Sequence, residues 1–524
     1  MEKPEKSTLE TLLDLCTTPD HAGSAAVIPA DAVIGEAERI LADGHPQPCD
    51  RQTWLSFLDI TRKPVFLQSL SGDTERRRWA DLAFAAIRHT GYDLRQMMEH
   101  RVAEHPNQVL FRDVSTSSPV DWTYEQVYHH IREIATVFHR LVPGGPRVAL
   151  YTENCFEGAC SDLACLMFNI FDTPLSPHFK QDVLLAIFDE LSVTIALADT
   201  AERLETLAAL QKQTRTPFTI LSLQPATQRT RDIPYLVEEA KKTGRQMMDD
   251  TLTAIPGRPL DEVATTMFTS GSTGLPKGVS FSIYNIVSKR FARAAALPEV
   301  GNETFLCYLP LFHTFGRYLE MTGAIFWSGT YIFAGNTSAE TLLSLFPRMN
   351  PSGFISIPLR WQELYDRCQE RIAGVASPDL RQQAVREVVG HRLHWGLSAA
   401  GYLDPAVFRF FNHFGIHLNS GFGMTEATGG ITMTPPGMYR EYSVGVPLPG
   451  VRTRLTENSE LELSGHYIGR YLEVAGPGNR IPYPLSEEAD TWLPTGDVFR
   501  VSDDGYFEII DRVKDIYKNN RGQT

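Results

Sequence analysis

A single lysine stands near the end of a glycine- and hydroxyl-rich stretch, TSGSTGLPKG at residues 269–278. Runs of Gly, Ser and Thr are usually surface turns. This run, however, follows the strand-like segment VATTMF (263–268) and precedes the helix-compatible segment 284–297. A strand that runs into a glycine loop and then a helix presents free backbone N–H groups to an anion, commonly phosphate. Lys277 would add positive charge to such a phosphate loop.

The spacing around the lysine disfavours the commonest phosphate loop. A Walker loop has glycine directly before its lysine and Ser or Thr directly after it. Here Pro276 precedes Lys277 and Gly278 follows it. A nucleotide kinase is therefore disfavoured, and other motifs must indicate which phosphate chemistry is meant.

Composition narrows the class of protein. The 524 residues carry a formal charge of −14, which argues against a nucleic-acid binder but allows a small phosphate ligand. The seven cysteines have no zinc or disulfide spacing, which favours buried free thiols and a reducing compartment. The start lacks the apolar core of a signal peptide, and no apolar run approaches the ~20 residues of a membrane span. We expect a soluble, cytoplasmic protein, and leave its oligomeric state and any peripheral membrane contact open.

The secondary structure that must position these residues is expected to differ between parts of the chain. Residues 1–90 show apolar residues at helical spacing, and Ser7 with Glu10 has the pattern of a capping box. We interpret this part as a helical appendage. Residues 511–524 form a separate, polar end of the sequence.

The middle of the sequence predicts a layered α/β fold. From 91 to 440, strand-like runs such as 147–151 and 193–199 alternate with helix-like segments, among them 377–390, where Ser377 would cap and Pro378 would begin the helix. This alternation indicates mostly parallel sheets, whose ligands sit at the carboxyl ends of strands. Residues 441–510 contain short strands joined by Asn, Asp and Gly turns, which predicts a small antiparallel β-subdomain.

Four further motifs accompany the loop, in this order: LPLFHTFGR (309–317), GFGMTEATGG (421–430), PTGD (494–497) and DRVKD (511–515). Together with TSGSTGLPKG they resemble the motifs of the adenylate-forming superfamily, which includes acyl-CoA synthetases, luciferases and the adenylation domains of nonribosomal peptide synthetases and carboxylic acid reductases. The resemblance covers roughly residues 95 to 524. Within the superfamily, the chain looks most like the long-chain fatty acyl-CoA synthetases, with carboxylic acid reductase adenylation domains next.

The resemblance implies a reaction. A carboxylate, expected to belong to a fatty acid, attacks the α-phosphate of ATP; pyrophosphate leaves and an acyl-adenylate forms, which is then transferred to CoA or an acyl carrier. Both reactants are anions, so the site has to screen charge. Two alternatives stay open: the adenylation domain of a carboxylic acid reductase or other carrier-linked enzyme, and a non-catalytic module that binds ATP or an acyl-adenylate.

The resemblance also implies roles for individual residues. Lys277 and the loop would hold the β- and γ-phosphates, Thr425 would contact the α-phosphate, Glu426 would hold Mg²⁺, and His313 would gate the acyl pocket. The loop residues that would wrap the phosphates are Thr269, Ser270, Gly271, Ser272, Thr273 and Gly274. Arg317, four residues after His313, is interpreted as structural.

The base and ribose of the nucleotide would be held by the later motifs. The Phe422 ring would stack on adenine, and Asp497 would accept hydrogen bonds from the ribose hydroxyls, helped by Arg512. The residues expected to border the base are Ala400, Gly401, Gly421 and Gly423. Lys514 would be the hinge about which a smaller C-terminal domain rotates. That domain, with a lysine near its end, is not in the sequence, so residues 511–524 are expected to be a hinge cut before it.

Overall fold

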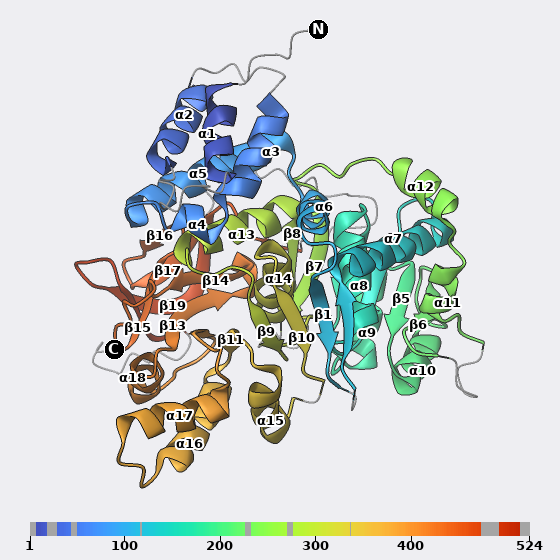
Figure 1. Ribbon diagram of the computed structural model, residues 1–524. Coiled ribbons are helices and arrows are strands. Elements are labelled where there is room, and N and C mark those ends of the chain that lie inside the picture. The colour runs from blue at the N-terminus through green and yellow to red at the C-terminus, as the bar shows by residue number, and fades with distance from the viewer. Residues whose placement is uncertain are drawn as a thin grey trace.

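The structure is a computed structural model of the chain. It describes residues 7–17, 29–42, 50–115, 118–225, 232–269, 276–335, 337–472 and 492–513. Two β-sheets form its framework, and helices cover them (Figure 1). This is the predicted layered α/β architecture.

The smaller sheet has seven strands in the order β18-β8-β7-β4-β3-β5-β6. From β7 to β6 the neighbouring strands are parallel, and β8 and β18 add antiparallel pairs at one side. The strands are β3 (Arg147–Tyr151), β4 (Phe171–Pro174), β5 (Ile195–Ala198), β6 (Thr219–Ser222), β7 (Val263–Thr269), β8 (Lys277–Ser282) and β18 (Arg470–Tyr471).

The larger sheet has thirteen strands in the order β16-β17-β19-β20-β15-β14-β13-β12-β11-β9-β10-β1-β2. They are β1 (Val109–Asp113), β2 (Val120–Thr123), β9 (Thr304–Cys307), β10 (Thr330–Phe333), β11 (Gly353–Ser356), β12 (Trp395–Ser398), β13 (His417–Met424), β14 (Gly429–Met433), β15 (Ser443–Pro447), β16 (Val451–Leu455), β17 (Glu460–Gly465), β19 (Leu493–Val501) and β20 (Phe507–Arg512). Strands β1 and β9 to β13 are joined by parallel pairs, and the antiparallel strands predicted after residue 440 continue the same sheet.

The predicted helices of the first 90 residues are present. They are α1 (Thr8–Thr17), α2 (Ala30–Ala42), α3 (Asp50–Thr61), α4 (Pro64–Leu67) and α5 (Asp73–Thr90). The Glu10 N–H donates to Ser7 Oγ at 3.2 Å, which is one half of the predicted capping box. Figure 1 shows these helices gathered at one end of the molecule, where α5 packs on α13 (Ile283–Ala296). The division of the chain at residues 90, 440 and 510 stays a prediction.

The other helices cover the sheets (Figure 1). They are α6 (Leu94–Glu104), α7 (Tyr124–Leu141), α8 (Phe156–Met167), α9 (Gln181–Leu191), α10 (Ala201–Leu210), α11 (Leu236–Lys241), α12 (Arg245–Thr253), the π-helix η1 (Phe315–Met321), α14 (Thr322–Phe326), α15 (Ala339–Met349), α16 (Pro358–Ile372), α17 (Pro378–Val389), α18 (Pro405–His413) and the short 3₁₀ turn η2 (Thr425–Ala427). Ser377 occupies the N-cap of α17 and Pro378 begins it, but the Ser377 side chain makes no capping hydrogen bond. The prediction of this cap is therefore right in position and wrong in mechanism.

Two expectations drawn from the composition, on the cysteines and on membrane spans, can be compared with the structure. Four cysteines are buried free thiols: Cys160, Cys165, Cys307 and Cys368. Among the helices of the described segments, none is both long enough and apolar enough to cross a membrane.

Candidate active site

The phosphate loop joins two strands instead of a strand and a helix. β7 and β8 pair antiparallel from Val263 and Ser282 up to Thr269 and Lys277. α13 begins only after β8, and its first turn is already capped by Ser282 and Asn285. The expected strand–loop–helix order is therefore wrong, because β8 intervenes, and the helix N-terminus is not next to the loop. Phosphate binding would rest on the amides of the loop and on Lys277.

Most of the loop lies outside the described residues. The residues concerned are Ser270, Gly271, Ser272, Thr273 and Gly274. At its two ends, the Thr269 hydroxyl donates to the Lys277 carbonyl at 3.4 Å, and the Lys277 side chain is exposed to solvent. Lys514, the predicted hinge residue, also lies outside the described residues.

Glu426 lies in a turn between two strands of the larger sheet. β13 ends at Met424, η2 turns the chain, and β14 returns antiparallel to β13. The Glu426 side chain is buried in this turn, next to the solvent-accessible Thr425. The phosphate loop and this motif therefore do not meet at one edge of a single sheet, because β7 and β13 belong to different sheets.

The two-residue strand β18 connects the two sheets at this point. Its backbone pairs with β8, Tyr471 opposite Val279, and the preceding Gly469 N–H donates to the Glu426 carbonyl at 2.6 Å. The Tyr471 hydroxyl donates to Glu426 Oε1 at 2.6 Å, while Lys277 Nζ lies 5.3 Å from the centre of the Tyr471 ring. Tyr471 therefore contacts both the predicted phosphate lysine and the predicted magnesium carboxylate.

Sequence reasoning did not find Tyr471, because it lies in none of the five motifs and β18 is too short to show a strand pattern. Burial, and after it the Glu426 carboxylate, raises the pKa of Tyr471 above its ordinary value. The phenol therefore keeps its proton at neutral pH and remains a hydrogen-bond donor to Glu426.

Asp497 and Arg512 face each other on neighbouring strands. The two residues are directly paired across β19 and β20, and Arg512 Nε lies 3.1 Å from Asp497 Oδ1. Burial raises the pKa of the Asp497 carboxyl; the Arg512 charge opposes this, and the charges of Glu460 and Glu426 add to it. Glu426 and Glu460 therefore both act on Asp497, and Glu460 is a second residue that the motifs did not reveal.

The binding of Mg²⁺ by Glu426 stays a prediction. In the described part of the chain, no group of three or more His, Cys, Asp or Glu could hold a metal ion by itself. Mg²⁺ takes oxygen ligands and usually keeps waters and substrate phosphates, so one carboxylate can be an adequate protein share. Glu426, with the Asp497 and Glu460 carboxylates nearby, could be that single protein ligand.

Phe422 is packed into the protein. Its ring lies edge-on to Phe499 of β19, with ring centres 5.0 Å apart, and the side chain is buried. Gly421 and Gly423 have a packing reason of their own, because a Cβ at either position would press on backbone atoms of β14. The stacking of Phe422 on adenine stays a prediction.

Ala400 and Gly401 follow the carboxyl end of β12, beside the strand that carries Phe422. β12 and β13 are parallel, and their register places Ser398 opposite Ser420. The two predicted base-contacting segments therefore leave neighbouring strands at the same edge. Ala400 adopts a left-handed conformation (φ 69°), which costs a non-glycine residue free energy and is typical of functional loops.

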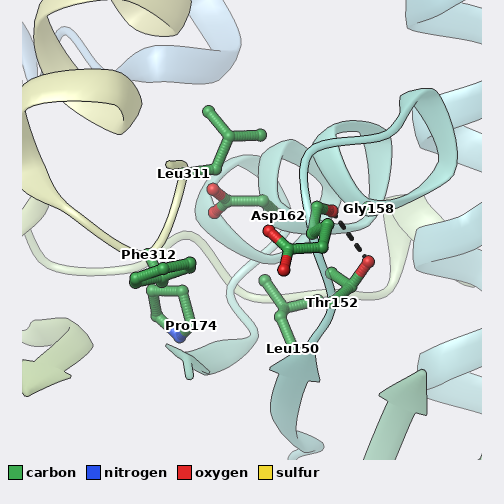
Figure 2. Close-up of a pocket in the computed structure, with 8 residues that line it drawn as sticks. Leu150, Thr152, Gly158, Asp162, Pro174, Leu311 and Phe312 are labelled. Carbon is green, nitrogen blue, oxygen red and sulfur yellow. Dashed lines mark hydrogen bonds between the residues drawn. The ribbon is translucent and has the colours of Figure 1, made fainter. Parts of the chain in front are cut away.

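His313 lies in the turn between β9 and the π-helix η1. The His313 side chain reaches solvent, yet desolvation by the surrounding protein lowers its pKa below the ordinary value. The ring is thus neutral at pH 7 and can donate or accept a hydrogen bond. Figure 2 shows Leu311 and Phe312 of the same motif lining a small pocket with Asp162 and Pro174.

Arg317 fastens this motif to the smaller sheet. Its guanidinium is fully buried and contacts Asp162 of α8 at 2.5 Å, Asp172 of β4 at 2.7 Å and the Thr265 hydroxyl of β7 at 2.7 Å. β7 is the strand that leads into the phosphate loop. Arg317 therefore ties the acyl motif to that loop's strand, as expected for a structural residue.

Known proteins resemble this chain in sequence and in fold. Residues 98–479 match the family described as "AMP-binding enzyme". The long-chain-fatty-acid–CoA ligase ACSBG1 of Rattus norvegicus is 24% identical over 446 residues, which are 77% of this chain and 62% of that protein. The chain spans about three-fifths of the length of the first curated relatives it matches.

Solved structures share the fold. The anthranilate CoA ligase AuaEII, in complex with anthranoyl-AMP, superposes with a TM-score of 0.67 at 17% identity, covering 82% of this chain and 78% of that one. ATP-bound MatB from Rhodopseudomonas palustris gives a TM-score of 0.64 at 19% identity, covering 82% and 80% of the two chains. At such identities the likeness shows the fold alone.

Proposed function

The chain belongs to the AMP-binding enzyme family, and from this premise we propose that it activates a fatty acid with ATP. A carboxylate oxygen of the acid attacks the α-phosphorus, the bond to the bridging oxygen breaks, and pyrophosphate leaves with that electron pair. The resulting acyl-adenylate then gives its acyl group to the sulfur of CoA, and AMP leaves. The choice of acid and acceptor rests on relatives that are named long-chain-fatty-acid–CoA ligases.

One observation carries the proposal: Tyr471 holds Lys277 and Glu426 at one place although they come from different sheets. Two anions must approach each other in this reaction, so positive charge has to be fixed where negative charge gathers. Lys277 supplies one such charge. Glu426 would hold Mg²⁺ as a second one, on the phosphates, and Thr425 beside it would contact the α-phosphate.

The nucleotide and the acid would approach from different sides of the junction that Tyr471 forms with Lys277 and Glu426. Asp497 would take the ribose hydroxyls, with Arg512 holding the Asp497 carboxylate in place. Phe422, Gly421, Gly423, Ala400 and Gly401 would border the adenine. On the acid's side, a neutral His313 adds no repulsion to an incoming carboxylate and can donate a hydrogen bond to it.

Two other functions would give different results in assays of acyl transfer to CoA and of pyrophosphate exchange. If the acceptor is the thiol of an acyl carrier, as in carboxylic acid reductases, the adenylation step would proceed and CoA would fail to take the acyl group. If the protein is a non-catalytic module, ATP would bind and no acid would promote exchange of pyrophosphate into ATP. The retention of Lys277, Glu426 and Asp497 favours catalysis over binding alone.

Calorimetry with ATP tests the nucleotide site directly. We expect a dissociation constant between about 1 mM and 1 μM for the 524-residue chain. Asp497→Ala should weaken binding by about 1.5–3 kcal/mol, the usual contribution of hydrogen bonds to a charged group. Asp504→Ala, on the neighbouring turn and paired with Arg440, is the matched control. Equal ATP affinity in the parent and in Asp497→Ala would remove Asp497 from the site.

A further inference from the structure

Helix α13 carries three cations into the core. Lys289, Arg290 and Arg293 are 1%, 1% and 3% exposed, and the helix is buried on all sides from Ile283 to Ala295. Lys and Arg are almost never fully buried unless they are paired. Within the described residues, however, none of the three forms an ion pair with a carboxylate, so this cluster needs an explanation.

Neutral groups compensate the three charges only in part. Lys289 Nζ donates to the Gly430 carbonyl and lies 3.7 Å from the centre of the Tyr467 ring. Arg293 Nη1 reaches the Met433 sulfur at 3.3 Å. Nε and Nη1 of Arg290 and Nε of Arg293 have no hydrogen-bond partner in the part of the chain that is described. A buried donor without a partner costs about 1–3 kcal/mol, and more when it is charged.

The electrostatics of the cluster agree with this geometry. Burial lowers the pKa of Lys289 well below its ordinary value, and the charges of Arg293 and Arg290 lower it further. Burial together with the neighbouring Arg293 lowers the pKa of Arg290 to about 9, and burial lowers that of Arg293 to about 10. An anion held among the three side chains would reverse these shifts.

The cluster borders the acyl motif on the inner side of the junction around Glu426. Lys289 and Arg293 contact β14, the strand that leaves η2, at Gly430 and Met433. Arg290 faces α14, where a Cβ on Gly323 would lie 3.6 Å from Arg290 Nη1. At the start of β14, a Cβ on Gly429 would lie 3.9 Å from Thr314 Oγ1 of the acyl motif.

The glycines at this border let the backbone of β14 and α14 pack directly against the cations. A Cβ on Gly430 would collide with the Arg293 guanidinium, so the strand can pass the cluster only as glycine. From Gly429 to Met433, β14 extends about 13 Å at the usual rise per residue. An acid that bound with its reacting carboxylate near Thr425 and His313 and ran along β14 would bring its other end to the cluster.

We propose that Lys289, Arg290 and Arg293 bind a second carboxylate at the far end of the acid, so that the substrate is a dicarboxylic acid. Guanidinium groups match a carboxylate in shape and charge and can bind it through two parallel hydrogen bonds. This inference rests on the proposed function and narrows it from fatty acids in general to those that are carboxylated at both ends.

Matched pairs of acids test the proposal. Adipic, sebacic and hexadecanedioic acids are compared with hexanoic, decanoic and hexadecanoic acids, by calorimetry and by acid-dependent pyrophosphate exchange. In the parent, at least one diacid should bind about tenfold or more tightly than its monoacid partner, the scale of one charged hydrogen bond. Arg290→Met should remove this preference, and Arg290→Lys should keep part of it. Arg371→Met, which removes a surface cation paired with Glu387, should leave it unchanged.

Thermal unfolding provides the second measurement. Arg290→Met should unfold at the same or a higher temperature than the parent, because an uncompensated buried charge is replaced by an apolar side chain. The preferred diacid should raise the unfolding temperature of the parent and leave that of Arg290→Met unchanged.

The outcomes separate this inference from the proposed function. Equal affinity of the parent for diacid and monoacid, or a diacid preference that survives in Arg290→Met, would overturn the inference. If monoacids then still promote pyrophosphate exchange, the proposed function stands without it. If no acid of either kind promotes exchange, both fall.

Discussion

Two arginines in the core, Arg317 and Arg290, have opposite surroundings. Both are at most 1% exposed. Arg317 is held by two carboxylates and two hydroxyls, and the charges of Asp162 and Asp172 raise its pKa well above the ordinary value against the effect of burial. Arg290 meets no carboxylate in the described part of the chain, and burial lowers its pKa to about 9. A buried cation with all its partners supports the framework, whereas one without them indicates a place for an anion.

Removal of the paired arginine should have the largest effect. Arg317→Met would leave Asp162 and Asp172 buried without their cation, and breaking a buried ion pair in this way costs about 3–5 kcal/mol. Urea unfolding of the variant should show this loss in the free energy of unfolding. A loss below about 1 kcal/mol would erase the contrast with Arg290→Met, for which we expect no loss.

At the junction around Tyr471, a second buried charged group, Glu426, also has a partner. Glu426→Gln tests the role of its charge. The amide keeps the shape of the side chain and loses the charge that a hard cation requires. We expect Mg²⁺-dependent pyrophosphate exchange to fall by a factor of about 10² or more, the scale of one lost electrostatic partner in a transition state.

The control for this variant is Glu441→Gln, a surface carboxylate paired with Arg409. The circular dichroism of both variants should match that of the parent. An unchanged magnesium titration in Glu426→Gln would show that the metal is held elsewhere.

Glu320 provides the negative counterpart of Arg290. It lies fully buried on η1 without a hydrogen bond of ordinary geometry among the described residues, and burial raises its pKa well above the ordinary value of 4.5. The folded chain therefore holds a proton there that the unfolded chain releases. The contribution of Glu320 to the free energy of unfolding should be fully present below pH 4.5 and should be lost as the pH rises through the pKa of the folded state.

Glu320→Gln should remove the contribution of Glu320 to that slope and stabilise the protein at pH 7 by about 1–3 kcal/mol, because the neutral amide does not have to take up a proton on folding. Chemical unfolding at several pH values measures both effects. Glu363→Gln, which affects a carboxylate paired with Arg360, should leave the slope unchanged. A parental slope that persists in Glu320→Gln would assign the proton to another group.

The smallest effect is expected for Tyr471→Phe. The variant loses one hydrogen bond to Glu426 and keeps the ring beside Lys277. Because the tyrosine is 39% exposed, we expect a loss of only about 0.5–1 kcal/mol, or two- to fivefold in pyrophosphate exchange. The apparent magnesium affinity should fall with it, which a merely structural role would not produce. Tyr402→Phe, at an exposed tyrosine, is the control.

Much of the fold was predictable because strands and helices of this type are local patterns. The runs 147–151 and 193–199 alternate with helices in the sequence and form β3 and β5 in the structure. A clear failure, the missed strand β8 between the phosphate loop and the helix, has a local cause. The residues Lys277–Ser282 pair with β7, and no periodicity in six residues distinguishes such a strand from the start of a helix.

The sequence by itself determined the family and the residues that its motifs carry, since motif order and spacing are properties of the chain. Only the tertiary structure decided which of them meet. The contact between Tyr471 and Glu426 joins residues 45 positions apart, and that between Lys289 and Gly430 joins residues 141 apart. Such contacts depend on how two sheets and a buried helix pack, and therefore on free energies summed over the whole core. For the same reason a lysine and two arginines that look like an ordinary helix surface in the sequence lie buried together in the fold.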